Sequence, residues 1–227
     1  TNSTVGNITG KTFVDESNRT SLTSLLGRVG YSYADRYYTE FSFRYDASSK
    51  FHKDYRWGFF PSVSAGWRIS SEPFFSENIK FIDYMKLRGS IATLGNDAIG
   101  GWQWMARYGI TTGAVFNGLS YGLEPKEVPN PKLTWEKSTS YNIGFDSRWF
   151  RNKFDFSFEY FYRRTYDILD NLNVSVPTTF GASLPKENYS EVKSRGFEVE
   201  LGYNDRIGKV DYHLRGNFSF ANSWWSK

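Results

Sequence analysis

The sequence contains no cysteine, which excludes disulfide bridges, thiolate metal sites and cysteine catalysis. It also has no apolar run of about 18 residues or more, so it predicts no helix that spans a bilayer. Histidine occurs only at His52 and His213, each without a partner at metal-ligand spacing, and both are interpreted as solvated side chains. We therefore expect no metal and no cofactor.

Charge of one sign is nowhere concentrated. The formal net charge is +4, and basic and acidic residues alternate along the chain without a sustained basic stripe. Nucleic-acid binding depends on such a stripe. Nucleic acid is therefore not an expected partner.

Aromatic residues are abundant instead. Phe, Tyr and Trp make up 19% of the chain, whereas its mean hydropathy is −0.56. A soluble core is usually built from aliphatic residues. An aromatic-rich but polar chain is typical of strands with one apolar face and one hydrated face.

Strict alternation of apolar and polar residues supports this interpretation. Between residues 37 and 46, Phe41, Phe43 and Tyr45 alternate with polar residues. The same pattern returns from residue 153 and again from residue 210. Successive side chains of a strand point to opposite faces, so these stretches are predicted to be amphipathic strands.

Eight long strands are predicted. They cover approximately residues 21–34, 37–47, 58–70, 83–94, 134–149, 153–168, 194–204 and 208–221. A globular strand averages about 5–6 residues, but a tilted strand needs about 9–11 to cross a bilayer. The fold class is therefore predicted as all-β, an antiparallel transmembrane β-barrel.

The connections are expected to alternate in length, as in outer-membrane barrels with short periplasmic turns and long extracellular loops. Short turns are predicted at residues 35–36, 151–152 and 204–208. Residues 71–82 would be an extended periplasmic connection. The expected extracellular loops are residues 1–20, 48–57, 95–133 and 169–193.

Specific strings add a resemblance to a known family. GRVGYSYADRYY (27–38), RYDASSKF (44–51) and RWGFFPSVSAGWRISSEPFF (56–75) closely resemble barrel segments of SusC/RagA-type TonB-dependent outer-membrane transporters. MKLRGSIATLGN (85–96), PNPKLTWEKSTSYNIGFD (129–146) and RGFEVEL (195–201) resemble later segments in the same order. The resemblance covers about residues 21–221.

The resemblance implies more than the pattern does. Members of this family have a 22-stranded barrel closed by an N-terminal plug, pair with a SusD-like surface lipoprotein, and import glycans or peptides with energy passed on by TonB. They lie among the lipids of the outer membrane of Gram-negative bacteria. This chain has no plug and room for only about eight strands, so we expect an interior part of such a barrel, with TonB contacted by an N-terminal part outside this chain.

Candidate sites are few. Trp102, Trp104 and Tyr108 in the predicted loop 95–133 are hypothetical substrate contacts, since aromatic rings stack on sugars and pack against peptides. The alternative is that these rings pack loop against loop or against the lipoprotein.

Catalysis is not expected. Glu159 could share a face with Glu198 or Glu200 and suggest a glycosidase. Arginines occupy the same predicted face, so mixed charges that line a hydrated lumen are the simpler interpretation. The chain is predicted not to be an enzyme.

Two functions remain. The first is the barrel wall of an active transporter. The second is a soluble carbohydrate-binding β-domain that uses its aromatic residues as a ligand platform. The two differ in whether the aromatic face meets lipid or a second sheet.

Overall fold

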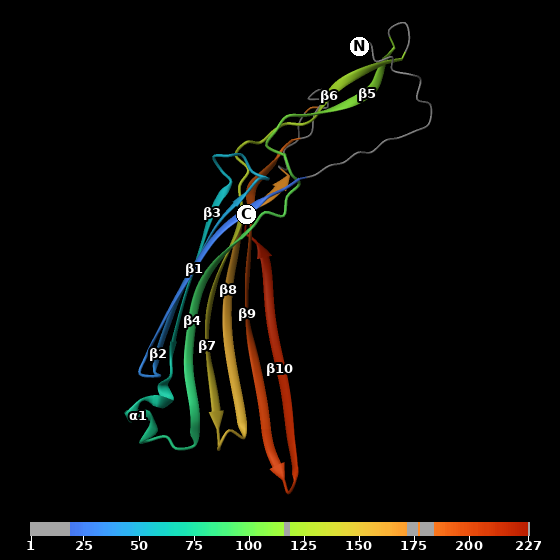
Figure 1. Ribbon diagram of the computed structural model, residues 1–227. Helices are drawn as coiled ribbons and strands as arrows, with labels where there is room; N and C mark the ends of the chain where they lie inside the picture. Colours follow the sequence, from blue (N-terminus) through green and yellow to red (C-terminus); the bar gives the residue numbers. More distant parts are fainter. Residues whose placement is uncertain (1–18, 116–118, 172–176, 178–183, 227) are drawn as a thin grey trace.

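The computed structural model describes residues 19–115, 119–171, 177 and 184–226. It is dominated by one sheet of eight long strands, from which a separate two-stranded hairpin projects (Figure 1). The strands are β1 (Leu22–Tyr33), β2 (Tyr37–Ser48), β3 (Trp57–Trp67), β4 (Ile82–Asn96), β5 (Arg107–Val115), β6 (Leu119–Glu127), β7 (Glu136–Trp149), β8 (Phe154–Asn171), β9 (Lys186–Ile207) and β10 (Val210–Trp225).

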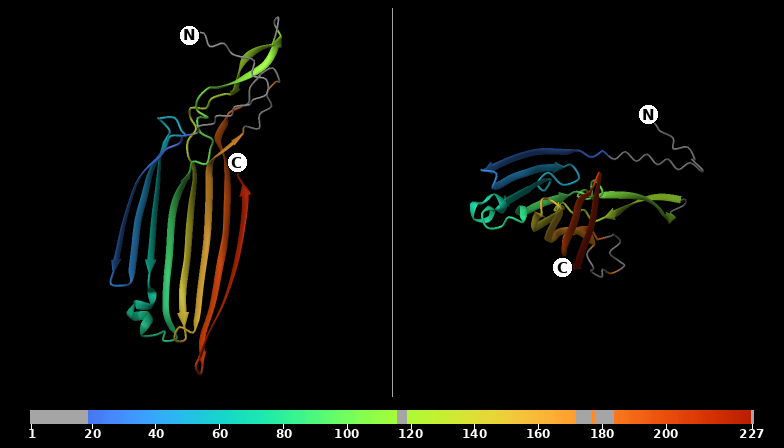
Figure 2. Two further views of the ribbon diagram at one scale, coloured as in Figure 1. Left: turned by 45° about the vertical axis from the view of Figure 1, so that its right-hand side comes forward. Right: turned by 90° about the horizontal axis from the view of Figure 1, so that it is seen from below.

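The strand order of the large sheet is β1-β2-β3-β4-β7-β8-β9-β10, and each neighbouring pair is antiparallel. Viewed from below, the sheet follows an arc with β1–β3 on one arm and β8–β10 on the other (Figure 2). In the described part of the chain, β1 and β10 each have a single neighbour, so the arc is open. The predicted all-β fold with eight antiparallel strands is confirmed.

The region around residues 95–133 was predicted as one long loop, and this is wrong in part. It contains β5 and β6, which pair as an antiparallel hairpin beyond the end of the large sheet (Figure 1). Two neighbouring strands are also longer than expected, because β8 continues to Asn171 and β9 already begins at Lys186. Their ends pair with each other, which extends the sheet on this side.

The connections at the opposite end are short. Ala34 and Asp35 have φ of 52° and 53°, and Arg36 N donates to Tyr33 O over 3.0 Å to close the first turn. Residues 150–152 form the β7–β8 turn, likewise with positive φ. Glycine at position 208 has φ of 62°, a left-handed conformation that glycine adopts without steric cost. The third turn thus lies at the end of the predicted segment 204–208.

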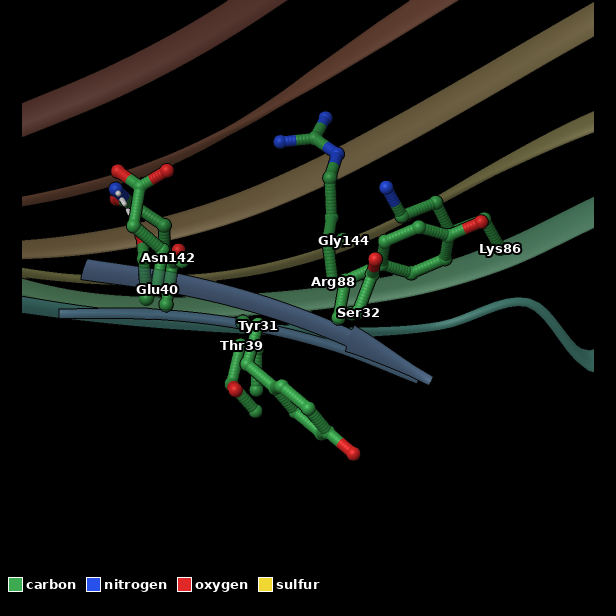
Figure 3. A pocket seen from close by; sticks show the side chains of 15 residues that line it. Tyr31, Ser32, Thr39, Glu40, Lys86, Arg88, Asn142 and Gly144 are labelled. Carbon is green, nitrogen blue, oxygen red and sulfur yellow. Dashed lines mark hydrogen bonds between the residues drawn. The ribbon is translucent and has the colours of Figure 1, made fainter. Parts of the chain in front are cut away.

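The two faces of the sheet differ sharply. One carries aromatic and aliphatic side chains that nothing in the described structure covers, such as Val29 at 69% exposed, Ile143 at 64% and Phe218 at 61%. Rings on neighbouring strands meet along this face: the Phe158 and Phe197 centroids lie 6.4 Å apart, and those of Phe197 and Phe218 5.9 Å. The other face is polar and lies on the concave side of the arc (Figure 3).

The compact core lies at the loop end, away from the middle of the sheet. Phe51, Phe60, Leu133 and Trp135 are all buried and pack together. The Trp135 indole N–H also donates to Arg56 O over 2.8 Å. This cluster joins the β2–β3 connection to the segment that leads into β7.

The β3–β4 connection holds a short 3₁₀ turn (Ile69–Ser71) and the single-turn helix α1 (Pro73–Ser76). No helix among the described residues has the length and apolar character needed to span a membrane. Proline at the first helical position suits the start of a helix because its missing N–H has no partner there.

Glu72, just before α1, fastens this connection to the sheet. Its buried carboxylate accepts hydrogen bonds from Tyr37 Oη at 2.7 Å, Trp67 Nε1 at 3.1 Å and Arg36 Nη1 at 3.2 Å. The hydrogen bond from Tyr37, followed by that from Trp67, lowers the pKa of Glu72 below its ordinary value of 4.5.

This lowered pKa makes the anchor of α1 sensitive to acid. Its stabilising contribution is complete above pH 4.5 and is lost as the pH falls through the lowered pKa of the folded state. In the full-length protein, amide exchange in residues 69–81, corrected for intrinsic pH dependence, should therefore speed up in that acid range.

The Glu72→Gln variant should show fast exchange in this segment at every pH, because it has no carboxylate to titrate. Glu77→Gln removes an exposed carboxylate from the same connection and should behave like the wild type. Parallel pH profiles for the wild type and Glu72→Gln would contradict the assignment.

Candidate functional site: the polar wall and the loop end

The strand register brings polar side chains from distant parts of the chain into rows on the concave face. In one row Tyr38 lies opposite Gly66, Gly66 opposite Arg88, and Arg88 opposite Gly144. Figure 3 shows Glu40, Lys86 and Arg88 on this side of the sheet, whereas Tyr31 and Thr39 point away from it. The alternation seen in the sequence thus becomes a continuous polar wall.

Arg88 is the centre of the wall. Its guanidinium forms an ion pair with Glu159 on β8, and its Nε donates to Asp146 Oδ2 on β7 over 3.2 Å. Ser157 Oγ donates to the other oxygen of Asp146 over 2.7 Å. One arginine therefore links three strands.

Gly144 makes this crossing possible. It lies on β7 between Arg88 and Glu159 in the register. A Cβ at this position would lie 3.3 Å from Arg88 Cζ and 2.5 Å from the carbonyl oxygen of Phe158. A larger residue would therefore push the guanidinium off the strand and separate β7 from β8.

A shallow hollow of about 480 Å³ lies beside this arginine. Its polar lining includes Glu40, Lys86, Arg88 and Asn142 (Figure 3). The Lys86 ammonium lies 4.4 Å from the centre of the Tyr38 ring, within the range of a cation–π contact. The hollow presents both signs of charge to the concave side.

A second polar group lies nearer the turns. Arg148 Nε lies 3.6 Å from Asp155 Oδ1, and Asn204 Nδ2 donates to Asp155 Oδ2 over 2.6 Å. The Nδ1 atom of His213 is 2.9 Å from Asn204 Oδ1. His213 is therefore a member of a hydrogen-bonded group on the polar wall.

The other histidine lies at the loop end. His52 Nδ1 is 3.3 Å from Asp54 Oδ2, and the imidazole meets the Trp104 ring edge to face at 5.2 Å. Within the described part of the chain, no group of three or more His, Asp or Glu side chains has the arrangement to hold a metal ion.

The carboxylates considered for glycoside hydrolysis do come together, since Glu159 on β8 lies opposite Glu198 on β9. However, Glu159 is ion-paired with Arg88, and Glu200 Oε1 lies 3.8 Å from Arg215 Nη1. Glu159 and Glu200 therefore each have a guanidinium partner on the polar face. The arrangement suits a mixed-charge wall.

The structure brings two of the three predicted contact residues together. The rings of Trp102 and Trp104 lie 6.2 Å apart in a tight turn after β4, where Trp102 has φ of 66°. Trp102 is 41% exposed, while Trp104 packs on His52. Tyr108 is the second residue of β5 and is 63% exposed.

Sequence reasoning missed two contributors to the site. Asp146 was not singled out, although its place on the polar face follows from the alternation in β7. Phe60 was not recognised as a core residue, because its strand carries phenylalanine on both faces. Its ring lies over Gly95 so closely that a Cβ there would collide with it. One clue to its role was available: by the alternation in β3, Phe60 falls on the polar face.

A curved antiparallel sheet of long strands, with an uncovered aromatic face outside and a charged face inside, defines the wall of a β-barrel membrane protein. The family model of the β-barrel of TonB-dependent receptor-like proteins matches residues 1–226. The chain belongs to this family.

Relatives agree with this assignment. The chain is 35% identical over 201 residues to TonB-dependent receptor P39 of Formosa agariphila, which covers 88% of this chain and 19% of that protein. It is 30% identical over 195 residues to TonB-dependent receptor SusC of Bacteroides thetaiotaomicron, with 84% and 19% covered. The chain thus spans about a fifth of the length of these relatives.

Solved structures show the same architecture. The RagAB peptide importer in its open-open state superposes with a TM-score of 0.80 at 25% identity, over 92% of this chain and 22% of that one. The siderophore receptor PirA of Pseudomonas aeruginosa, at 16% identity and a TM-score of 0.57, shares the fold. The predicted resemblance to the SusC/RagA type is confirmed.

The geometry around Arg88 predicts a measurable coupling between Arg88 and Glu159. In the full-length protein, a double-mutant cycle with Arg88→Met and Glu159→Gln should give about 0.5–1 kcal/mol of coupling in the free energy of unfolding, because both side chains are partly shielded.

The matched control is the cycle between Arg215 and Glu200 on the same face. These two side chains are 71% and 56% exposed and 3.8 Å apart, so their coupling should be near zero. Equal coupling in the two cycles would show that Arg88 does not link the strands as described.

Proposed function

We propose that this chain forms part of the wall of an outer-membrane transporter that imports glycans or peptides. The observation that carries the proposal is the opposed pair of faces on one long-stranded sheet. An uncovered aromatic face is stable against lipid, and a charged face is stable only against a hydrated lumen. Such a wall conducts a solute and performs no chemistry on it.

The likeness to the RagAB peptide importer supports import as the activity. This chain covers about a fifth of the length of its relatives. The choice between peptide and glycan therefore depends on parts of the protein that lie outside it. We propose a SusD-like surface lipoprotein as the partner and TonB as the energy source, contacted through a plug that precedes the barrel. The location proposed is the outer membrane of a Gram-negative bacterium.

A soluble carbohydrate-binding domain is less well supported. Such a domain would bury its aromatic face under a second sheet. Among the described residues, the one sheet other than the large one is the β5–β6 hairpin. It projects beyond the loop end and does not cover the aromatic face (Figure 2). Side chains such as Tyr31 at 64% exposed would then contact water.

We further propose that Trp102 and Trp104 contact the imported solute from the loop end. Their rings are neighbours, Trp102 is partly exposed, and packing of Trp104 on His52 holds the pair in place. An immobilised pair of aromatic rings offers a platform for a sugar face or an apolar peptide side chain. The exposed Tyr108 ring is a further candidate in the same proposal.

The transport proposal predicts two properties of the full-length protein. It should require detergent in solution and show heat-dependent mobility in gels, as barrels do. Cells should also lose uptake of its solute, tested with oligosaccharide and oligopeptide mixtures, when tonB is deleted. A protein that is monodisperse in plain buffer and lacks heat-dependent mobility would refute the proposal.

The aromatic pair predicts a specific loss of affinity. Trp102→Ala combined with Trp104→Ala should weaken solute binding about tenfold, since each aromatic contact contributes about 0.5–1.5 kcal/mol. Isothermal titration of the purified full-length transporter measures this. Phe150→Ala removes an exposed ring at the opposite end and should bind normally. Unchanged affinity in the tryptophan variant would remove the pair from the site.

A further inference from the structure

The outer, aromatic face carries an unexpected group of cations near the loop end. On β8 this face presents Phe154, Phe156, Phe158, Tyr160 and Tyr162 in turn, and the next residue on it is Arg164. On β9, Arg195 and Lys193 follow Phe197 on the same face. Along both strands the residue type changes from apolar aromatic to basic.

Two of these cations face each other directly. Arg164 and Lys193 are cross-strand partners, and Arg195 is the next residue on that face of β9, opposite Tyr162. Like charges placed opposite each other destabilise a sheet. Two cations placed opposite each other despite this cost indicate a function or a partner.

One carboxylate binds two of the three cations. Glu191 is 12% exposed and binds both Arg164 Nη2 at 2.6 Å and Lys193 Nζ at 3.1 Å. Arg195 has no ion pair among the described residues and lies 5.5 Å over the Trp224 ring. Three cations with one carboxylate leave a net positive charge on this outer surface, which we call the basic patch.

The height of the basic patch places it at the level of lipid headgroups. Arg164 lies ten residue steps after Phe154, which at about 3.4 Å per step is about 34 Å of strand. At a tilt of about 40° this rises about 26 Å, and the apolar band of a barrel is about 25 Å tall. The aromatic residues thus fill the hydrocarbon layer and the cations lie at its edge.

The basic patch is also local. At the loop end of β1–β3, the outer face carries Leu25, Tyr45 and Trp57. Tyr45 and Trp57 stack with centroids 4.6 Å apart. The cations therefore mark one site on the circumference and are not a belt shared by every strand.

We propose that Arg164, Lys193 and Arg195 bind the phosphate groups of an anionic lipid in the outer leaflet. The proposal rests on the membrane location argued above. Guanidinium groups match phosphate oxygens with paired hydrogen bonds, and the ammonium adds a point charge. The Tyr162 and Trp224 rings beside them suit the boundary between headgroup and acyl chain.

The test measures lipid retention by the full-length protein. The probe is diphosphoryl lipid A, titrated onto detergent-solubilised protein and followed by native mass spectrometry. The variant with Arg164→Gln, Lys193→Gln and Arg195→Gln should bind about a hundredfold more weakly, because each basic side chain near an anionic surface contributes about fivefold. Arg164→Lys with Arg195→Lys keeps the charge and should retain most of the binding.

A matched control removes equal charge from the other face. Arg148→Gln, Arg163→Gln and Arg215→Gln change three cations of the polar wall and should leave lipid binding unchanged. Heat-dependent gel mobility shows whether each variant is folded. Equal lipid binding by the two triple variants would overturn the proposal, as would equal binding of a lipid A analogue without phosphate or binding of inorganic phosphate but not of lipid.

Failure here is distinguishable from failure of the transport proposal. A detergent-dependent, heat-modifiable protein that transports its solute but binds lipid without regard to phosphate would overturn the basic patch alone. A protein that needs no detergent would overturn the membrane location and the basic patch with it.

Discussion

The rest of the structure depends on the continuous antiparallel register of eight strands. Because side chains alternate between the faces, a shift of one residue in any pairing would turn the aromatic face of that strand inward and its charges outward. Over the body of the sheet the register holds without such a reversal, and it shifts only near Ile82 in the β4–β7 pair and between Thr165 and Leu169 in the β8–β9 pair. It thereby separates a lipid-facing surface from a polar wall that can line a channel.

The two ends of the sheet are fastened in different ways. At the turn end, the Glu72 carboxylate gathers three hydrogen bonds from Tyr37, Trp67 and Arg36 and holds the only extended connection at this end of the described sheet. At the loop end, the apolar cluster around Phe60 and Trp135 joins long connections. The turn end thus depends on charge and hydrogen bonding, while the loop end depends on burial of apolar surface.

Charged side chains are arranged differently on the two faces of the sheet. On the polar wall, Arg88 is paired with two carboxylates, those of Asp146 and Glu159, so that its positive charge is fully compensated. On the outer face, Arg164 and Lys193 share one carboxylate and remain cationic in sum. A network in which the cation is compensated by carboxylates suits a wall that lines a hydrated lumen. An unbalanced one at the edge of the apolar band suits a fixed anionic neighbour.

The sequence by itself determined the strand type and the faces, because period-two alternation is a local property of an extended backbone. It placed Glu159 and Arg88 on one face and Phe158 on the other without any knowledge of neighbours. The ordered family strings also indicated the class of barrel. The hairpin within residues 95–133 was not predicted. Its two strands are defined by their pairing with each other, and the local sequence pattern does not indicate that pairing.

Only the tertiary structure decided which side chains meet. Arg88 and Glu159 are 71 residues apart, and their ion pair depends on the register across β7 and on Gly144 between them. Likewise, the apposition of Arg164 and Lys193 follows from the β8–β9 pairing, which fixes Lys193 as the partner of Arg164. Contacts between distant segments depend on the arrangement of the whole sheet, and a periodic sequence leaves that arrangement open.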